Sequence, residues 1–183
     1  MAIAVQPFEG SYKLDGNHSS FQFSVAHLGL SKFRASFADI DARLIADDDG
    51  DITLVGHARA DSISIEDPDF RAHVVHGGDF FEADTHPLIV FRSTSIELAE
   101  DRSVAVAGEL EIRGVSHPVT ATGTYAPTIT DPFGVSRAAL ELKATVDRRD
   151  WEMSWQLALP DGGDALGWEV EITADLEMLK EEA

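Results

Sequence analysis

The chain has 183 residues, of which 44% are apolar, and a formal charge of −19. This length and composition predict one globular domain over residues 1–183 and exclude an intrinsically disordered chain. The negative charge would repel a phosphate backbone, which excludes nucleic acid as a partner and also electrostatic docking on an anionic membrane. The absence of cysteine excludes disulfides, thiolate metal sites and a cysteine nucleophile.

The N-terminal sequence MAIAVQPFEGSYKL lacks a basic region followed by an apolar run, so no signal peptide is expected. No stretch approaches the ~18–20 apolar residues of a membrane span, so stable membrane insertion is not expected. These features predict a cytoplasmic protein.

The first part of the chain alternates between apolar and polar residues, as a half-buried strand does. A short strand is predicted at 11–15, a turn at 16–17 and a longer strand over 20–27. Over 33–44 the apolar positions change parity. This change predicts a β-bulge near Ala38-Asp39, because bulges are common where barrel strands bend.

The acidic run DDDGD at 47–51 predicts a solvated hairpin turn. A calcium-binding loop is the alternative. With Gly50 at position six of such a loop, Ile45 and Gly56 would occupy positions one and twelve, where ligands are required. Neither residue supplies one, so the turn is the better interpretation.

The alternation is interrupted between the predicted strands at residues 67–87. Asp67-Pro68 is a favourable start for a helix, and Gly77-Gly78 a favourable end. The sequence therefore predicts a short helix from about Asp67 to His76. A helical insertion rich in aromatic and histidine residues suits one end of a barrel.

Alternation then resumes and continues to the C-terminal region. Turns are predicted at 114–118 and 131–134, and strands at about 88–98, 103–113, 119–125, 138–146 and 166–176. Eight or nine strands with one apolar and one charged face are typical of an antiparallel sheet closed around an apolar interior. Small inward-facing residues leave room for one ligand, or reflect simple packing taper; they are Gly56, Ala58, Ala60, Gly108, Ala121, Gly123, Ala138 and Ala144.

Several short motifs occur in a fixed order along residues 11–177. They are Asp15-x-x-His18-Ser19-x-Phe21-x-Phe23-x-Val25-x-His27, Arg34-Ala35-Ser36-Phe37, Asp79-Phe80-Phe81-Glu82 with Pro87 and Phe91-Arg92-Ser93, Gly108-x-Leu110-x-Ile112-x-Gly114 with Pro118-Val119, Arg148-Arg149-Asp150-Trp151, and Leu166-Gly167. In order and spacing the chain resembles the YceI-like family of lipocalin-like bacterial proteins associated with polyisoprenoid binding. It departs from the family at Ala72 and Val74, where Asp and His are usual, at Glu152, where glycine is usual, and at Trp168, where an acid is common.

The resemblance implies an all-β fold, an extended lipocalin-like antiparallel barrel of about eight strands with a short helical insertion. It also implies a hydrocarbon chain inside the barrel. The expected tunnel wall consists of Phe21, Phe23, Val25, Phe37, Phe91, Leu110, Ile112, Leu140, Leu142 and Trp168. The expected donors to a polar head group at the rim are Arg34, Arg71, His73 and His76.

Two histidines in the insertion, His73 and His76, precede several acidic residues. Imidazole and carboxylate ligands suit zinc, but the spacing matches no closed metal-binding pattern. The chain also lacks a G-x-S-x-G elbow, a P-loop and an H-E-x-x-H motif. We therefore assign no catalytic residue, no metal and no cofactor.

The function expected from these features is non-catalytic binding, transport or storage of a long-chain amphiphilic lipid, isoprenoid-like, inside the barrel. The bound lipid would be the only ligand, and a homodimer is an open alternative to a monomer. One alternative is a metal- or His/acid-dependent enzyme that acts on a small apolar substrate. Another is a structural barrel whose interior is filled by its own side chains.

Overall fold

The computed structural model describes residues 6–182. These residues form ten strands, one α-helix and two short 3-10 helices. In chain order the elements are β1 (Gly10–Leu14), β2 (Ser20–His27), β3 (Ser31–Ser36), β4 (Ile40–Ala46), β5 (Ile52–Arg59), η1 (Ala60–Ser62), α1 (Pro68–His76), β6 (Leu88–Leu98), β7 (Ser103–Ile112), β8 (Val115–Thr130), β9 (Ser136–Asp147), η2 (Arg148–Trp151) and β10 (Leu166–Lys180).

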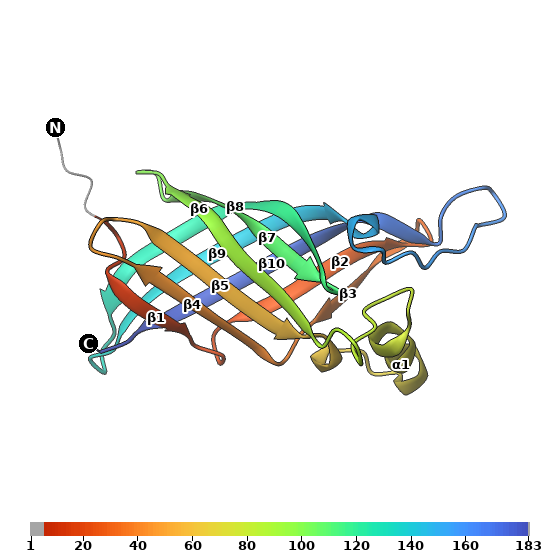
Figure 1. The fold of residues 1–183 in the computed structure, drawn as a ribbon, viewed down its shortest axis with the longest axis horizontal. Helices are drawn as coiled ribbons and strands as arrows, with labels where there is room; N and C mark the ends of the chain where they lie inside the picture. Colours follow the sequence, from red (N-terminus) through yellow and green to blue (C-terminus); the bar gives the residue numbers. More distant parts are fainter. Residues whose placement is uncertain (1–5, 183) are drawn as a thin grey trace.

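Eight of the strands close into an antiparallel barrel (Figure 1). The strands follow the order β1-β4-β5-β6-β7-β8-β9-β10, and pairing of Tyr12 with Lys180 and of Leu14 with Met178 joins β1 to β10. Closure satisfies the backbone groups that an open edge would leave unpaired. The predicted all-β barrel of about eight strands is confirmed.

The two remaining strands extend the barrel at one end. The hairpin of β2 and β3 pairs with β10 over Val170–Asp175, while the last residues of β10 pair with β1. Strand β10 therefore has two successive neighbours on one side, and β9 on the other. The β2–β3 hairpin lengthens the interior beyond the closed ring of eight strands.

The predicted bulge near Ala38-Asp39 is wrong, because the chain is not one strand there. Strand β3 ends at Ser36, Phe37 forms an isolated bridge with Ile63, and β4 begins at Ile40. The apolar positions change from odd to even numbers because two separate strands are involved. Strand β3 pairs with β2 in the extra hairpin, whereas β4 pairs with β1 and β5 in the barrel.

The predicted turn at 114–118 is also wrong in its extent. The turn is formed by Arg113 and Gly114, both with positive φ, and Pro118 lies within β8 opposite Glu109. Strand β9 pairs with β8 only from Thr122 onward. Pro118 thus lies in a part of β8 that has a partner strand on one side only, which is the kind of edge position where proline occurs in sheets.

The predicted helix is confirmed as α1. The Asp67 side chain caps it by accepting a hydrogen bond from the Phe70 N–H (2.7 Å), and Pro68 occupies the first turn. At the other end Gly77 has φ −62° and donates its N–H to the His73 carbonyl, so the left-handed cap that glycine permits is not used. Val74 and Val75 are buried, which seats the helix beside the end extended by the β2–β3 hairpin (Figure 1).

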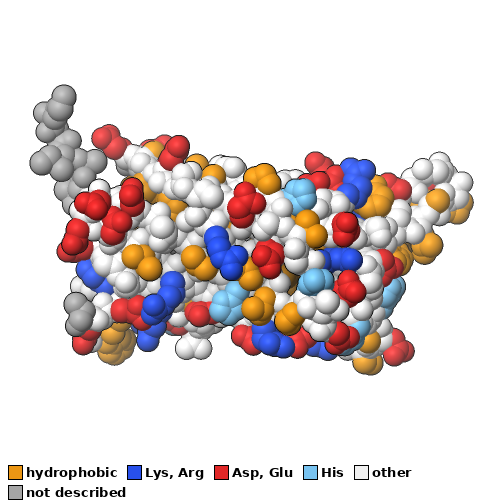
Figure 2. Space-filling view, viewed as in Figure 1, with side chains coloured by type: hydrophobic (Ala, Val, Ile, Leu, Met, Phe, Trp, Pro, Cys, Tyr) orange, Lys and Arg blue, Asp and Glu red, His pale blue; other side chains and the backbone are white. Residues whose placement is uncertain are grey.

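The core divides along the barrel axis. At the end away from α1, the interior is filled by fully buried side chains, of which the largest are Phe8, Tyr12, Leu44, Leu140, Val106 and Met178. The outside carries charged groups of both signs, with many carboxylates (Figure 2). No helix within residues 6–182 is long and apolar enough to cross a membrane.

Candidate functional site

Two adjoining cavities occupy the other part of the interior. The mouth chamber, about 490 Å³, lies between β2, β3, α1 and the chain around Trp155. The inner chamber, about 120 Å³, lies deeper, between β4, β5, β6, β9 and β10. Four side chains line both chambers: Phe21, Ile89, Leu110 and Ile172. The two chambers therefore adjoin and share these apolar walls, and together they have the size used for small-molecule binding.

The inner chamber exists because many of its walls are small. Strand alternation turns one residue in two toward the axis, and at this level most of those residues lack bulk. The small lining residues are Ala42, Gly56, Ala58, Ala121, Ala144 and Ala174. These small residues therefore leave space inside the barrel and do not only reflect packing taper.

Aromatic rings line the mouth chamber. The rings of Phe21 and Phe37 stack with centroids 5.5 Å apart, and Phe37 meets Phe81 edge-on at 5.8 Å. Nearer the opening, Phe80 stacks on Trp155 at 5.8 Å and contacts the His73 ring edge-on at 5.2 Å. Such pairs add stability beyond area burial and hold the wall in a defined shape.

Few polar side chains reach the mouth chamber. They are His27, Ser31, Lys32, His73 and Arg148. Arg148 is only 4% exposed, and its guanidinium donates to the backbone carbonyls of Met153 (2.5 Å), Leu166 (3.3 Å) and Gly167 (2.8 Å). Burial lowers the pKa of Arg148. This residue ties the chain after η2 to the start of β10 and leaves a buried cation beside the cavity.

Most of the side chains predicted as tunnel wall line one chamber or both. These are Phe21, Phe23, Val25, Phe37, Phe91, Leu110, Ile112 and Leu142. Leu140 lies instead in the filled end of the barrel. Trp168 lies outside both linings, with the guanidinium carbons of Arg148 and Arg149 4.1 and 4.9 Å from its ring centroid. A register irregularity between Leu166 and Val170 takes Trp168 out of the regular alternation.

Of the predicted rim donors, only His73 lines the mouth chamber, where its Nε2 lies 3.2 Å from an Asp79 carboxylate oxygen. His76 is half exposed and pairs with Asp84. Arg71 donates to the Asp61 carbonyl, and Arg34 lies in a polar groove on the outside of the barrel.

Sequence reasoning missed several lining residues, among them Lys32, Phe33, Phe70, Phe80, Trp155 and Arg148. The motif Asp79-Phe80-Phe81-Glu82 was a usable signal for Phe80. Alternation in β3 was a usable signal for Phe33, which shares a face with Ala35. It could not find Phe70 or Trp155, because α1 and the 152–165 loop reach the opening only in the folded chain.

The segment from Gly77 to Glu82 is held by the β7–β8 turn. Arg113 donates to the carbonyls of Gly78 (2.5 Å) and Phe80 (2.7 Å), and its guanidinium lies 3.4 Å from Glu82. This anchor positions Phe80 and Phe81 in the cavity wall.

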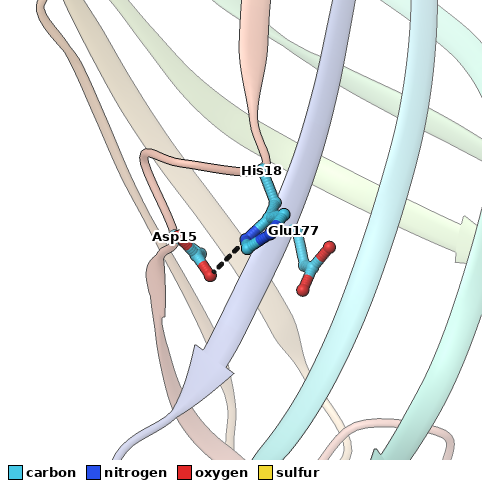
Figure 3. A group of neighbouring side chains, drawn as sticks. All are labelled: Asp15, His18 and Glu177. Atoms are coloured by element: carbon cyan, nitrogen blue, oxygen red, sulfur yellow. Dashed lines mark hydrogen bonds and ion pairs between the residues drawn. The ribbon is translucent and has the colours of Figure 1, made fainter.

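His73 and His76 form separate pairs with Asp79 and Asp84, so the two histidines do not share one cluster. Within residues 6–182, one group brings three potential metal-ligating atoms within 4.8 Å of one another, namely Asp15, His18 and Glu177 (Figure 3). It lies where β10 exchanges its neighbour β2 for β1. Arg137 donates to both Asp15 (2.8 Å) and Glu177 (2.9 Å), so a guanidinium already balances these carboxylates.

This ionic group stabilises the closure of the barrel, and its effect depends on pH. Hydrogen bonds from His18 and Arg137 lower the pKa of Asp15 from 3.8 to about 2. Because the folded-state pKa is the lower one, the unfolded chain binds more protons, and the contribution is lost as pH falls from about 4 through 2. We expect wild type to lose roughly 2 kcal/mol more than Asp15→Asn over this range, measured by urea unfolding.

The matched control for that experiment is Asp48→Asn, an exposed residue in the 47–51 turn. It makes the same charge change and should keep the wild-type pH profile. A wild-type profile as flat as that of Asp15→Asn would contradict the stabilising role of Asp15.

Comparison with known proteins gives one consistent result. The model of the YceI-like domain matches residues 12–178. A UPF0312 protein of Staphylococcus aureus (strain bovine RF122) is 29% identical over 169 residues, which cover 91% of this chain and 96% of that protein.

Three solved structures share the fold. BcnA of Burkholderia cenocepacia has a TM-score of 0.73 and 20% identity, and covers 90% of this chain and 98% of its own. The YCEI protein of Campylobacter jejuni has a TM-score of 0.70 and 19% identity, over 86% and 90%. A polyisoprenoid binding domain from Saccharophagus degradans, implicated in plant cell wall breakdown, has a TM-score of 0.60 and 12% identity, over 93% and 98%. Because the family model spans most of the barrel, the chain belongs to the family of YceI-like domains.

Proposed function

We propose that this protein binds a long-chain amphiphilic lipid inside the barrel, and that it carries or stores that lipid without catalysis. The observation that supports this most directly is the pair of adjoining apolar chambers inside the barrel. A chain threaded from the mouth inward would exchange water for apolar walls along its length, at about 0.8 kcal/mol per buried CH₂ before the entropic costs of binding.

An isoprenoid-like ligand is the form of this proposal that the fold relatives favour. The domain from Saccharophagus degradans is described as polyisoprenoid binding. Aromatic and branched side chains such as Phe23, Phe37 and Ile172 would contact the methyl branches of a prenyl chain. Its polar end would remain at the mouth, where His73 supplies a donor.

An enzymatic role has less support from the described residues. Catalysis at the predicted segment would need His73 and His76 to act on one reacting group, but they bond to different acids, Asp79 and Asp84.

The first test is direct. Protein purified without added lipid is analysed by native mass spectrometry and then extracted with organic solvent, and a long-chain prenol and a fatty acid are titrated into the stripped protein. We expect a co-purified amphiphile or saturable binding of a long-chain compound. Absence of both would contradict the proposal, and saturable binding of the fatty acid alone would remove the isoprenoid assignment.

The rim is tested by two histidines on the same helix. His73→Ala should weaken binding of an amphiphile about threefold to tenfold, because it removes one hydrogen bond to the polar end. His76→Ala is the matched control, since it also breaks a His–Asp pair but does not line the chamber. Equal effects of the two changes would place the head group elsewhere.

A further inference from the structure

Three exposed leucines stand at the end of the barrel where the mouth chamber opens. Leu28 and Leu30 belong to the β2–β3 turn, and Leu157 to the loop between η2 and β10; they are 38%, 84% and 61% exposed. Backbone hydrogen bonds join the two segments, from the Leu28 N–H to the Ala165 carbonyl (2.8 Å) and from the Ala165 N–H to the Leu157 carbonyl (2.9 Å). We call Leu28, Leu30 and Leu157 the leucine tip.

The leucine tip lies in uncharged sequence. Residues 27–31 and 153–160 contain no Asp, Glu, Lys or Arg, although the chain has 33 acidic and 14 basic residues. The loop projects beyond the barrel (Figure 1), and hydrophobic side chains lie on that projection (Figure 2). A protein that otherwise carries charge over its surface thus presents an uncharged group of leucines at the base of this loop, whose outer turn carries Asp161.

The leucine tip is continuous with the cavity wall. His27 and Ser31 flank the turn that carries Leu28 and Leu30, and both line the mouth chamber. Trp155, two residues before Leu157, lines it as well. Any surface that the tip enters would therefore lie next to the opening.

We propose that the leucine tip docks on the surface of a bilayer of zwitterionic lipids and brings the mouth chamber against it. Side chains of this kind insert at the boundary between head groups and acyl chains, where Trp155 would also be favourable. The net charge of −19, with Asp161 and Asp164 in the same loop, opposes an anionic surface.

The small size of the leucine tip favours a bilayer over a protein partner. A specific protein interface needs about 1,000 Å² of complementary surface, whereas three leucines on two adjoining segments match a fluid layer that closes around them. The purpose of docking, transfer of lipid between bilayer and barrel, rests on the function proposed above. The docking itself does not.

The test is sedimentation of the full chain with vesicles of phosphatidylcholine, alone or mixed with phosphatidylserine. We expect wild type to sediment with phosphatidylcholine, with little dependence on salt, and less with the mixture. Leu30→Ser and Leu157→Ser should each lower the partition coefficient about tenfold, as expected for removing one inserted leucine. Phe133→Ser is the matched control, because Phe133 is 91% exposed in the β8–β9 turn at the opposite end.

Binding of a long-chain lipid in vesicle-free solution separates the two proposals, because Leu30 and Leu157 do not line either chamber. Tip variants that bind lipid in solution but fail to sediment would support docking. Wild type that does not sediment, or an equal loss in Phe133→Ser, would overturn it. A dimer in solution that Leu30→Ser dissociates, with no vesicle binding, would also overturn it by assigning the tip to a second copy of the chain.

Discussion

The Ala144→Phe variant should stay folded and lose lipid binding by on the order of 100-fold. Ala144 lies on β9 and faces the inner chamber, opposite Ile172 on β10. That chamber is about 120 Å³, and a cavity of ~150 Å³ is enough to hold benzene, so one phenyl ring would largely fill it. A ligand that can no longer bury its terminal methylenes there loses ~0.8 kcal/mol for each of them.

Two other blocking positions are less suitable. A Cβ at Gly108 would lie 2.4 Å from the Arg92 carbonyl oxygen and 2.5 Å from the Phe91 ring, so Gly108→Leu would disturb the sheet itself. Leu110→Arg would place an unpaired charge where the side chain is buried between the chambers, and unfolding is the expected result. Ala144→Phe instead adds bulk into existing space, at an overpacking cost of ~1–3 kcal/mol.

The matched control is Ala139→Phe, the same change on the outward face of the same strand. It should bind lipid as wild type does. Circular dichroism and urea unfolding establish that both variants are folded, and titration of a long-chain lipid measures the affinity. A folded Ala144→Phe protein with wild-type affinity would show that the inner chamber is not used, and would confine any ligand to the mouth chamber.

The largest loss of stability from a single methyl group is expected at Gly123. A Cβ there would lie 1.7 Å from the Glu141 carbonyl oxygen and 3.2 Å from the Leu142 Cα, both in the backbone of β9. No rotamer change relieves a contact with backbone, so β8 and β9 must separate where Gly123 pairs with Leu142. We expect Gly123→Ala to lower the free energy of unfolding by roughly 3 kcal/mol or more.

Urea unfolding followed by circular dichroism measures this effect, with Gly16→Ala as the control. Gly16 lies in the turn after β1, and a Cβ there meets no atom within 4 Å. The control should change stability by less than about 1 kcal/mol. A Gly123→Ala protein as stable as the control would contradict the close approach of the Glu141 carbonyl oxygen to Gly123.

The sequence alone was sufficient to predict which residues face inward in a continuous strand that is buried along one face. In β7 the alternation of Val104, Val106, Leu110 and Ile112 with polar or small residues predicted the inward face, because one side of the strand is buried throughout. Helix α1 was equally predictable, since Asp67 and Pro68 act through the first turn of the helix itself. The family likewise followed from the order of short motifs.

Only the tertiary structure decided which side chains meet at the cavity. The extra β2–β3 hairpin depends on β10 having two successive neighbours, β2 and then β1. These pairings join residues that are more than a hundred positions apart in the sequence. Trp168 leaves the alternation because β10 is irregular there, and Arg148 reaches the mouth because it bonds to carbonyls of a distant strand. The cavity volume is the sum of side chains from many strands, so no local pattern determines it: local rules place a residue on a face, and packing of the whole barrel decides what that face encloses.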